Sequence, residues 1–210
     1  MGDTKQNIIL ESLRLFSEKG YGEVSISDIA DAVGIKGPSI YKHFSSKREI
    51  FDSIVGFMSD RYNEMASGLG IDGNDASSDS DMFNSIDEDR LVEMGASLFL
   101  FFLEDELNAR FRRMLSIGRY SDSELDSIYH RLYIDLPLSY QAEIFRGMLS
   151  GRNQDGNPDE NPDAMALEFY SPMLLLLMSC DTDPSRKDDA VASVEEHIRR
   201  FGRTYFGVSP

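Results

Sequence analysis

The sequence predicts an all-α protein of about nine helices, with an N-terminal helix-turn-helix domain and a larger helical body. Apolar residues recur at helical spacing along most of the chain, and no stretch alternates with period two over a strand's length. Glycine, proline and capping residues divide this pattern into helices. Charge separates two parts: residues 1–50 hold seven basic and seven acidic residues, so residues 51–210 carry the whole net charge of −16. We therefore expect domains at 1–50 and 51–210.

The first two helices have clear ends. A helix over about residues 5–19 should stop at Gly20, a residue that tolerates the left-handed conformation of a C-terminal cap. Ser25 and Asp28 have the spacing of a capping box and should begin the second helix. Gly34 should end that helix in a tight turn. A short helix-turn-helix hairpin is the expected result.

A third helix is expected from Pro38 to Phe44. Proline is favoured at the first helical position, and Ile40 and Phe44, four residues apart, should face inward. Ser46 and Glu49 form a second capping-box pattern, which should begin a long helix to about residue 66.

The body should contain the remaining helices. A polar loop is expected at 67–85, followed by helices at about 87–104 and 107–120. Ser121 and Glu124 resemble a third capping box, and the helix they begin should be kinked or split by Pro137 before ending near residue 149. A second polar loop is expected at 151–162. The last two helices should cover 163–180, interrupted by Pro172, and about 188–206.

Several classes of protein lack support in the sequence. Cys180 is the single cysteine, so no internal disulfide framework is possible. The longest apolar run, at 173–178, is much shorter than a membrane span, and the N-terminus has no signal-peptide pattern. A soluble, cytoplasmic protein is expected. No catalytic motif, cofactor loop or metal site is predicted, because the three histidines lack ligand spacing.

The outer face of the third predicted helix suits the major groove of DNA. Once Ile40 and Phe44 are assigned to the interior, small, aromatic and basic residues remain outside. The second helix of a helix-turn-helix enters the major groove, with its N-terminal residues nearest the base edges. Basic charge is concentrated at 36–48, although the domain is neutral overall. This pattern predicts binding to double-stranded DNA.

Residues 8–54 resemble the N-terminal domain of TetR-type bacterial transcriptional regulators (the TetR/AcrR family). The resemblance rests on Leu15, Phe16, Gly20, Tyr21, Ile26, Ile29, Ala30, Val33, Gly34, Ile35, Ser39, Ile40, Tyr41, His43, Phe44, Lys47 and Phe51. It implies a homodimer that binds a near-palindromic operator, and a C-terminal domain that takes a small-molecule effector and dimerises through its last two helices. The DNA-contacting positions that it implies are Ser27, Lys36, Gly37, Ser39, Tyr41, Lys42, His43 and Lys47.

The predicted helix at 163–180 is apolar nearly all round, so we expect both of its sides to be buried. One side would face its own core and the other a second subunit. Together with the apolar stripe of the last helix, it would form a four-helix dimer interface with twofold symmetry. The residues expected there are Tyr170, Leu174, Leu177, Val194, Ile198, Phe201 and Tyr205.

The middle helices are rich in aromatic and methionine side chains, which are typical both of ordinary cores and of pockets for apolar ligands. A pocket is expected here because the family resemblance implies one. Its candidate lining residues are Phe57, Arg61, Tyr62, Met65, Phe99, Phe102, Phe111, Met114, Tyr129 and Tyr133. Arg61 and Arg119 are the candidate polar anchors.

Three functions are consistent with these patterns. The leading one is a repressor that a small, mainly apolar ligand releases from its operator. The second is a ligand-blind DNA-binding scaffold whose acidic body recruits a protein partner. The third, an all-α enzyme, has no catalytic residues in its favour, so the sequence predicts that the protein is not an enzyme.

Overall fold

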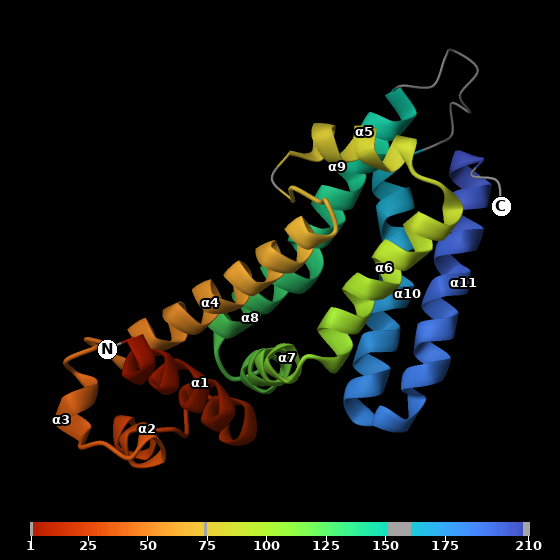
Figure 1. Cartoon of the computed structure of the whole chain (residues 1–210). Helices are drawn as coiled ribbons and strands as arrows, with labels where there is room; N and C mark the ends of the chain where they lie inside the picture. The colour runs from red at the N-terminus through yellow and green to blue at the C-terminus, as the bar shows by residue number, and fades with distance from the viewer. Residues whose placement is uncertain (1, 74, 151–160, 208–210) are drawn as a thin grey trace. The chain divides into compact units, whose positions relative to one another are not determined.

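The computed structural model describes residues 2–73, 75–150 and 161–207, in which every regular element is helical (Figure 1). The all-α prediction is confirmed. The α-helices are α1 Gly2–Lys19, α2 Ile26–Val33, α3 Gly37–Ile40, α4 Lys47–Gly68, α5 Ala76–Ser85, α6 Glu88–Glu104, α7 Glu106–Gly118, α8 Ser123–His130, α9 Leu136–Ser150, α10 Pro162–Thr182 and α11 Lys187–Phe206. A π-helical segment covers Arg131–Asp135 and a 3-10 turn covers Pro184–Arg186.

The chain forms two compact units. The first comprises Met1–Tyr62 with Glu106–His130, and the second comprises Asn63–Asp105 with Arg131–Pro210. The first unit extends past residue 50 because α7 packs against α1, which also packs against α2. The boundary at residue 50 therefore stays a prediction about where the DNA-binding part ends.

The ends of the first two helices lie where the sequence predicts them. The Ser25–Asp28 capping box is complete, since each side chain accepts a hydrogen bond from the other residue's N–H. Gly20 and Gly34 have φ of 89° and 76°, as their predicted caps require. Only backbone and side chains a few residues apart are involved, so the sequence alone could predict these ends.

The third helix is shorter than predicted. The α-helix ends at Ile40, and Tyr41, Lys42 and His43 form a turn. The N–H groups of Lys42 and His43 bond to carbonyls three residues earlier, at 3.3 and 2.9 Å, so the chain tightens after Ile40. The start of α4 differs as well: Ser46 accepts from the N–H of Glu49, whose carboxylate returns to Ser45 instead of completing the predicted box.

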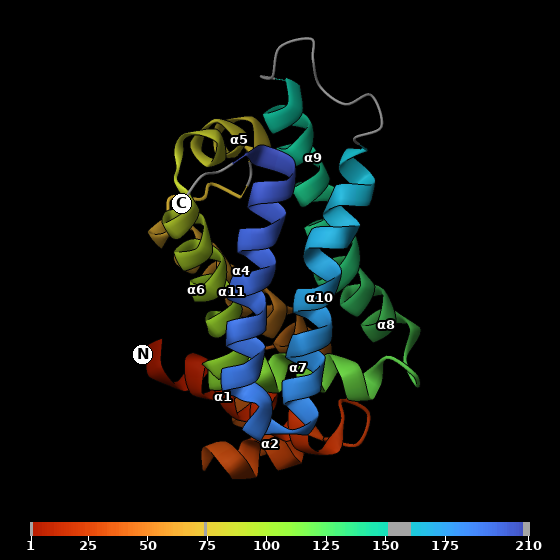
Figure 2. The same cartoon turned by 90° about the vertical axis from the view of Figure 1, so that its right-hand side faces the viewer.

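The second unit contains two apolar clusters formed mainly by α6, α9, α10 and α11, and Figure 2 shows α10 and α11 side by side. One cluster joins α6, α10 and α11 and includes the fully buried Val194 and Ile198. The other joins α9, α10 and α11 around Phe201, whose ring centroid lies 4.9 Å from that of Phe169. The core of this unit therefore depends on side chains from both of the last two helices.

The predicted loop at 67–85 contains a helix instead, α5. Asp75 caps its N-terminus, and Asp79, which is 1% exposed, accepts hydrogen bonds from the N–H groups of Asp72 and Gly73 and from the Tyr140 hydroxyl. The Ser80 hydroxyl donates to the Ile144 carbonyl at 3.1 Å. These contacts satisfy the buried polar side chains of α5, partly through groups on α9, a helix distant in sequence. The polar composition of this stretch therefore pointed to the wrong structure.

The tight contact between α5 and α9 leads to a stability prediction. A Cβ at Gly147 would lie 2.3 Å from the Ser80 hydroxyl oxygen, whereas a Cβ at Gly56, also inside a helix, would meet no atom within 4 Å. Gly147→Ala should therefore lower the urea midpoint despite its better helix propensity, and Gly56→Ala should stabilise by about 0.5–1 kcal/mol. Stabilisation by both alanines would show that α5 does not pack on α9 this closely.

One other predicted helix start requires correction, and one predicted helix break can be refined. Asp122, rather than Ser121, caps α8, because its carboxylate accepts from the N–H groups of Glu124 and Leu125. Pro137 does divide the following helix, with the π-helical segment just before it. Proline has no N–H, so it cannot donate the helical hydrogen bond to the Tyr133 carbonyl, and the Tyr170 hydroxyl donates to that carbonyl at 2.8 Å.

An ion pair joins α6 to α11. Glu88 is 4% exposed and accepts two hydrogen bonds of 2.6 Å from Arg203, with Arg199 at 3.9 Å. The bonds from Arg203 lower the pKa of the Glu88 carboxyl below its ordinary value of 4.5.

This pair should make folding stability depend on pH. Because the pKa of Glu88 is lowered in the folded state, its stabilisation is complete above about pH 4.5 and is lost as pH falls through the folded value. Urea melts of the wild type and Glu88→Gln should differ by a constant amount near neutral pH and converge in acid. A difference that does not change with pH would contradict the ion pair.

Candidate nucleic-acid interface

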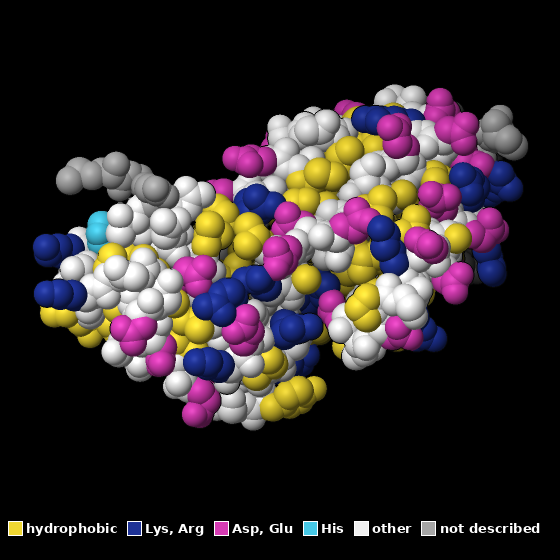
Figure 3. Space-filling model, turned by 60° about the horizontal axis from the view of Figure 1, so that its bottom comes forward, with side chains coloured by type: hydrophobic (Ala, Val, Ile, Leu, Met, Phe, Trp, Pro, Cys, Tyr) yellow, Lys and Arg dark blue, Asp and Glu magenta, His cyan; other side chains and the backbone are white. Residues whose placement is uncertain are grey.

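The outer face of α3 and of the turn that follows it is polar and accessible. Ile40 and Phe44 are 0% and 1% exposed, as predicted, while Tyr41 is 59% exposed. Lys42 is exposed and His43 is half-buried. Figure 3 shows a His side chain beside Lys or Arg side chains over α3. Ile40 and Phe44 thus anchor this segment in the core, and the side chains at 41–43 are wholly or partly exposed to solvent.

The N-terminal end of α3 is open. Lys36 occupies the N-cap position, but its side chain makes no capping hydrogen bond, and Pro38 lies in the first turn. A Cβ at Gly37 would meet no atom within 4 Å, and its φ is not positive. Folding therefore places no steric or conformational demand on glycine here, whereas the absence of a side chain lets another molecule approach the backbone closely. Ser39 is half-buried, and Ser27 on α2 is exposed.

Lys47 has a role inside the chain that local sequence patterns could not show. Its Nζ donates hydrogen bonds to the carbonyls of Tyr21 and Val24, both at 2.8 Å, and lies 4.5 Å from the centroid of the Tyr21 ring. Lys47 thereby joins the start of α4 to the connection between α1 and α2. These partners lie more than twenty residues away in the sequence.

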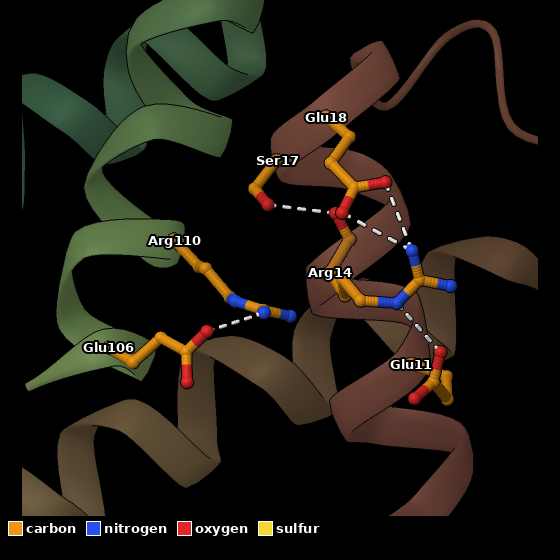
Figure 4. Close-up of polar contacts among 6 residues, drawn as sticks. All are labelled: Glu11, Arg14, Ser17, Glu18, Glu106 and Arg110. Carbon is orange, nitrogen blue, oxygen red and sulfur yellow. Dashed lines mark hydrogen bonds and ion pairs between the residues drawn. The ribbon is translucent and has the colours of Figure 1, made fainter.

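Other basic residues of the first unit are also neutralised within the chain. Arg48 pairs with Asp52 at 2.8 Å and with Glu124, and its guanidinium lies 5.3 Å from the Phe51 ring centroid. In Figure 4, Arg14 on α1 lies between Glu11 and Glu18, and Arg110 on α7 pairs with Glu106. The basic surface is therefore narrower than the predicted 36–48 cluster and is centred on Lys36 and Lys42.

The predicted dimer residues do not share one surface. Leu177, Val194, Ile198 and Phe201 are at most 6% exposed and lie in the unit's own core. Tyr170, Leu174 and Tyr205 are half-buried, and the Tyr205 hydroxyl donates to Glu168 at 2.7 Å. The apolar stripe of α11 packs against α6 of the same unit, which explains why it cannot also be a free surface.

The exposed apolar residues of α10 are different ones. Leu167, Leu175 and Met178 are 56%, 68% and 47% exposed. Their spacing, with Ser171 between the first two, places them along one side of the helix. The prediction that α10 has two apolar sides is thus consistent with the structure. The exposed side carries other residues than those predicted at the dimer interface, and that assignment stays a prediction.

The predicted pocket residues belong to both units. Those in the first unit are Phe57, Arg61, Tyr62, Phe111, Met114 and Tyr129, and those in the second are Met65, Phe99, Phe102 and Tyr133. Arg119, a predicted anchor, bonds to Asp126 at 3.1 Å and to the His130 ring at 3.0 Å. A shallow hollow of about 280 Å³ lies between α1 and α2, and its lining includes none of these residues. The ligand pocket stays a prediction.

The described residues give little support for metal binding or membrane insertion. Among the described residues, no group of three His, Cys, Asp or Glu side chains could hold a metal ion. Within the described ranges, one helix, α10, is long and apolar enough by composition to cross a membrane, with a mean hydropathy of 1.2. α10 also packs against α9 and α11 and contains Pro172, Asp163 and Glu168, so its apolar composition alone is weak evidence for a membrane span.

Comparisons with known proteins agree with this geometry. Residues 8–54 match the family described as "Bacterial regulatory proteins, tetR family". The chain is 43% identical over 207 residues to the biofilm operon icaADBC HTH-type negative transcriptional regulator IcaR of Staphylococcus aureus, covering 94% of this chain and 92% of that protein. It is also 47% identical over 60 residues, 26% of the chain and 29% of the relative, to the transcriptional repressor KstR2 of Rhodococcus jostii.

Solved structures share the fold over nearly the whole chain. A TetR-family regulator from Mesorhizobium loti has a TM-score of 0.68 at 18% identity, with 97% of each chain covered. SmeT, the repressor of the Stenotrophomonas maltophilia multidrug efflux pump SmeDEF, has a TM-score of 0.65 at 18% identity, covering 98% of this chain and 93% of SmeT. The 43% identity to IcaR over more than nine-tenths of each chain, the match at 8–54 and the helix-turn-helix geometry lead to one assignment. The chain belongs to the TetR family of bacterial transcriptional regulators, non-enzymatic DNA-binding proteins that act as dimers.

Proposed function

We propose that this protein is a dimeric repressor that binds a near-palindromic operator through α3 and its following turn, and that a small, mainly apolar ligand releases it. The observation that carries the proposal is the exposed polar face at 36–43, held in place by the buried side chains of Ile40 and Phe44. Repression is supported by the names of IcaR and KstR2, a negative regulator and a repressor. Such a protein would act in the bacterial cytoplasm, where operator DNA lies.

The proposed DNA contacts differ in kind. Ser39 has a hydroxyl that can hydrogen-bond to base edges, while the hydroxyl of Tyr41, the ammonium of Lys42 and the ring of His43 suit phosphate oxygens. Gly37 leaves the backbone accessible at the N-terminal end of α3. Ser27, Lys36 and Lys47 complete the proposed set, although Lys47 would have to contact DNA while holding the connection between α1 and α2.

We propose that the dimer forms through α10 and α11, with Leu167, Leu175 and Met178 in place of the buried residues first assigned. Several large apolar side chains exposed along one side of a helix are typical of a surface that a partner covers. Twofold symmetry would bring the same side from both subunits together. This arrangement would also account for the modest share, 22%, of the most apolar α10 window that is buried within one chain.

The proposed ligand response uses two states with different affinities for operator DNA. Ligand binding among the middle helices would move α4, which begins at the helix-turn-helix and ends in the second unit. That movement would change the separation of the two recognition segments from about one DNA turn, 34–36 Å. A ligand acts in this way only if it binds the two states unequally.

The test of the function is recovery of an operator. Genomic fragments bound by the purified protein should, after sequencing, contain a near-palindrome whose half-sites lie about one DNA turn apart. Tyr41→Ala should weaken binding to that site and to unrelated duplexes alike, because a phosphate contact carries no sequence information. Recovery of fragments with no shared sequence would contradict operator binding.

The ligand response has its own readout. A compound that raises the melting temperature of the free protein should also lower its affinity for the recovered operator, because the coupling between two ligands is reciprocal. Stabilising compounds that leave DNA affinity unchanged would instead support the ligand-blind scaffold.

A further inference from the structure

We propose that Lys5, at the start of α1, is an additional contact to the DNA backbone, beside the face formed by α3 and its turn. This inference rests on the proposed function and extends its surface to a helix that the sequence patterns did not associate with DNA. Among the basic residues before residue 50, Lys5 is the most distant from α3 in the sequence.

The structure brings Lys5 to the end of the recognition segment. Its Nζ lies 5.2 Å from the centroid of the Phe44 ring, which is 1% exposed and follows His43 directly. Hydrogen bonds from Ser45 lower the pKa of Glu49, and the positive charge of Lys5 contributes to this shift, so Lys5 also lies near the beginning of α4. Lys5 thus extends the basic surface from the Lys36–His43 segment to α1.

The charge of Lys5 is available to a partner. Its side chain is exposed, and among the side chains that the structure describes no carboxylate pairs with it. The cation–π contact with Phe44 directs the side chain without neutralising it. Lys47 and Arg48, nearer to α3 in the sequence, have ammonium and guanidinium groups engaged inside the chain. Lys5 therefore fits a phosphate better than either of those residues does.

A phosphate is the partner that these properties favour. An exposed ammonium is a compact charge that binds phosphate oxygens without strict geometry, and such contacts fix the orientation of a protein on DNA. Lys36 lies at the start of the recognition segment, Lys42 lies in the turn at its end, and Lys5 lies over Phe44, so the three charges would follow the DNA backbone outside the groove. Lys5 would position the protein and leave base preference unchanged.

The salt dependence of DNA binding tests this role. The full-length protein is titrated against a mixed-sequence duplex long enough for two half-sites, between about 50 and 200 mM salt. Each lost phosphate contact lowers the slope of log affinity against log salt by about 0.9, so Lys5→Gln in a dimer should lower it by about 1.8. Lys5→Arg, which keeps the charge, should restore the slope.

Two control variants separate the outcomes. Lys187→Gln removes the same charge from α11, where Lys187 pairs with Glu104, and should leave the slope unchanged. Lys42→Gln should lower the slope as Lys5→Gln does. If Lys5→Gln keeps the wild-type slope while Lys42→Gln lowers it, the proposed role of Lys5 is overturned and the proposed function is not. If Lys5→Gln and Lys187→Gln lower the salt slope equally, the effect comes from net charge and not from a contact at Lys5. If the wild type does not bind the duplex, the proposed function itself is overturned.

Discussion

Leu175→Glu is expected to convert the dimer into monomers in sedimentation velocity while leaving the helical content unchanged. Leu175 is 68% exposed on α10, so a carboxylate there is solvated in the monomer. In a twofold interface the same side of α10 meets its copy, and two carboxylates would be buried near each other without partners. Their desolvation and repulsion should favour dissociation.

Phe201→Ala should behave differently, although Phe201 was itself predicted to lie at the dimer interface. Phe201 is 3% exposed and its ring lies 5.3 Å from Phe145 and 4.9 Å from Phe169, centroid to centroid. Removing a ring from such a cluster costs about 3–5 kcal/mol, a large fraction of the stability of a domain. Urea denaturation should show this loss as a lower midpoint.

The control for the dimer experiment is Ile117→Glu, which places the same charge at an exposed apolar residue of the first unit, 47% exposed on α7. It should remain dimeric. If Leu175→Glu also remains dimeric, the interface does not include this side of α10, and if both variants dissociate, the effect is not specific to α10.

Lys47→Met is expected to lower the free energy of unfolding by about 2 kcal/mol, the typical contribution of hydrogen bonds from a charged donor. The substitution removes an ammonium that bonds to the Tyr21 and Val24 carbonyls and lies over the Tyr21 ring. Methionine keeps most of the apolar stem, so the decrease in the free energy of unfolding measures the contribution of the ammonium group. Urea denaturation at neutral pH measures it.

Lys42→Gln is the matched comparison for this prediction. Lys42 is exposed, so its removal should leave the urea midpoint nearly unchanged while lowering the salt slope of DNA binding by about 0.9 for each lost phosphate contact. Lys47→Met should instead lower the urea midpoint and, under conditions in which it remains folded, leave the salt slope of DNA binding nearly unchanged. A stable Lys47→Met with a lowered salt slope would make Lys47 a phosphate ligand, as the family resemblance implies.

The first helices could be predicted because their determinants are local. Ser25 caps a helix with Asp28 three residues away, Gly20 and Gly34 supply positive φ, and the buried pair Ile40 and Phe44 is one helical turn apart. The same segments present the proposed DNA-binding face, so the class of function could also be predicted from the sequence. The exposed position of Tyr41 follows from the same periodicity.

Tertiary contacts decided features whose determinants are distant in the sequence. Asp79 and Ser80 find partners on or near α9, so a segment with the composition of a loop becomes α5. Lys47 bonds to carbonyls more than twenty residues away, and Lys5 lies on Phe44.

The sequence by itself determined an all-α regulator with a helix-turn-helix, because helix periodicity and capping depend on neighbours within one turn. Only the tertiary structure decided which side of each apolar helix is core and which basic residues remain available to DNA. An apolar stripe shows that a surface must be covered, but not whether α6 of the same chain or a second subunit covers it. Likewise, the sequence shows that a lysine supplies a positive charge, but the fold decides whether that charge contacts a carbonyl, an aromatic ring or solvent.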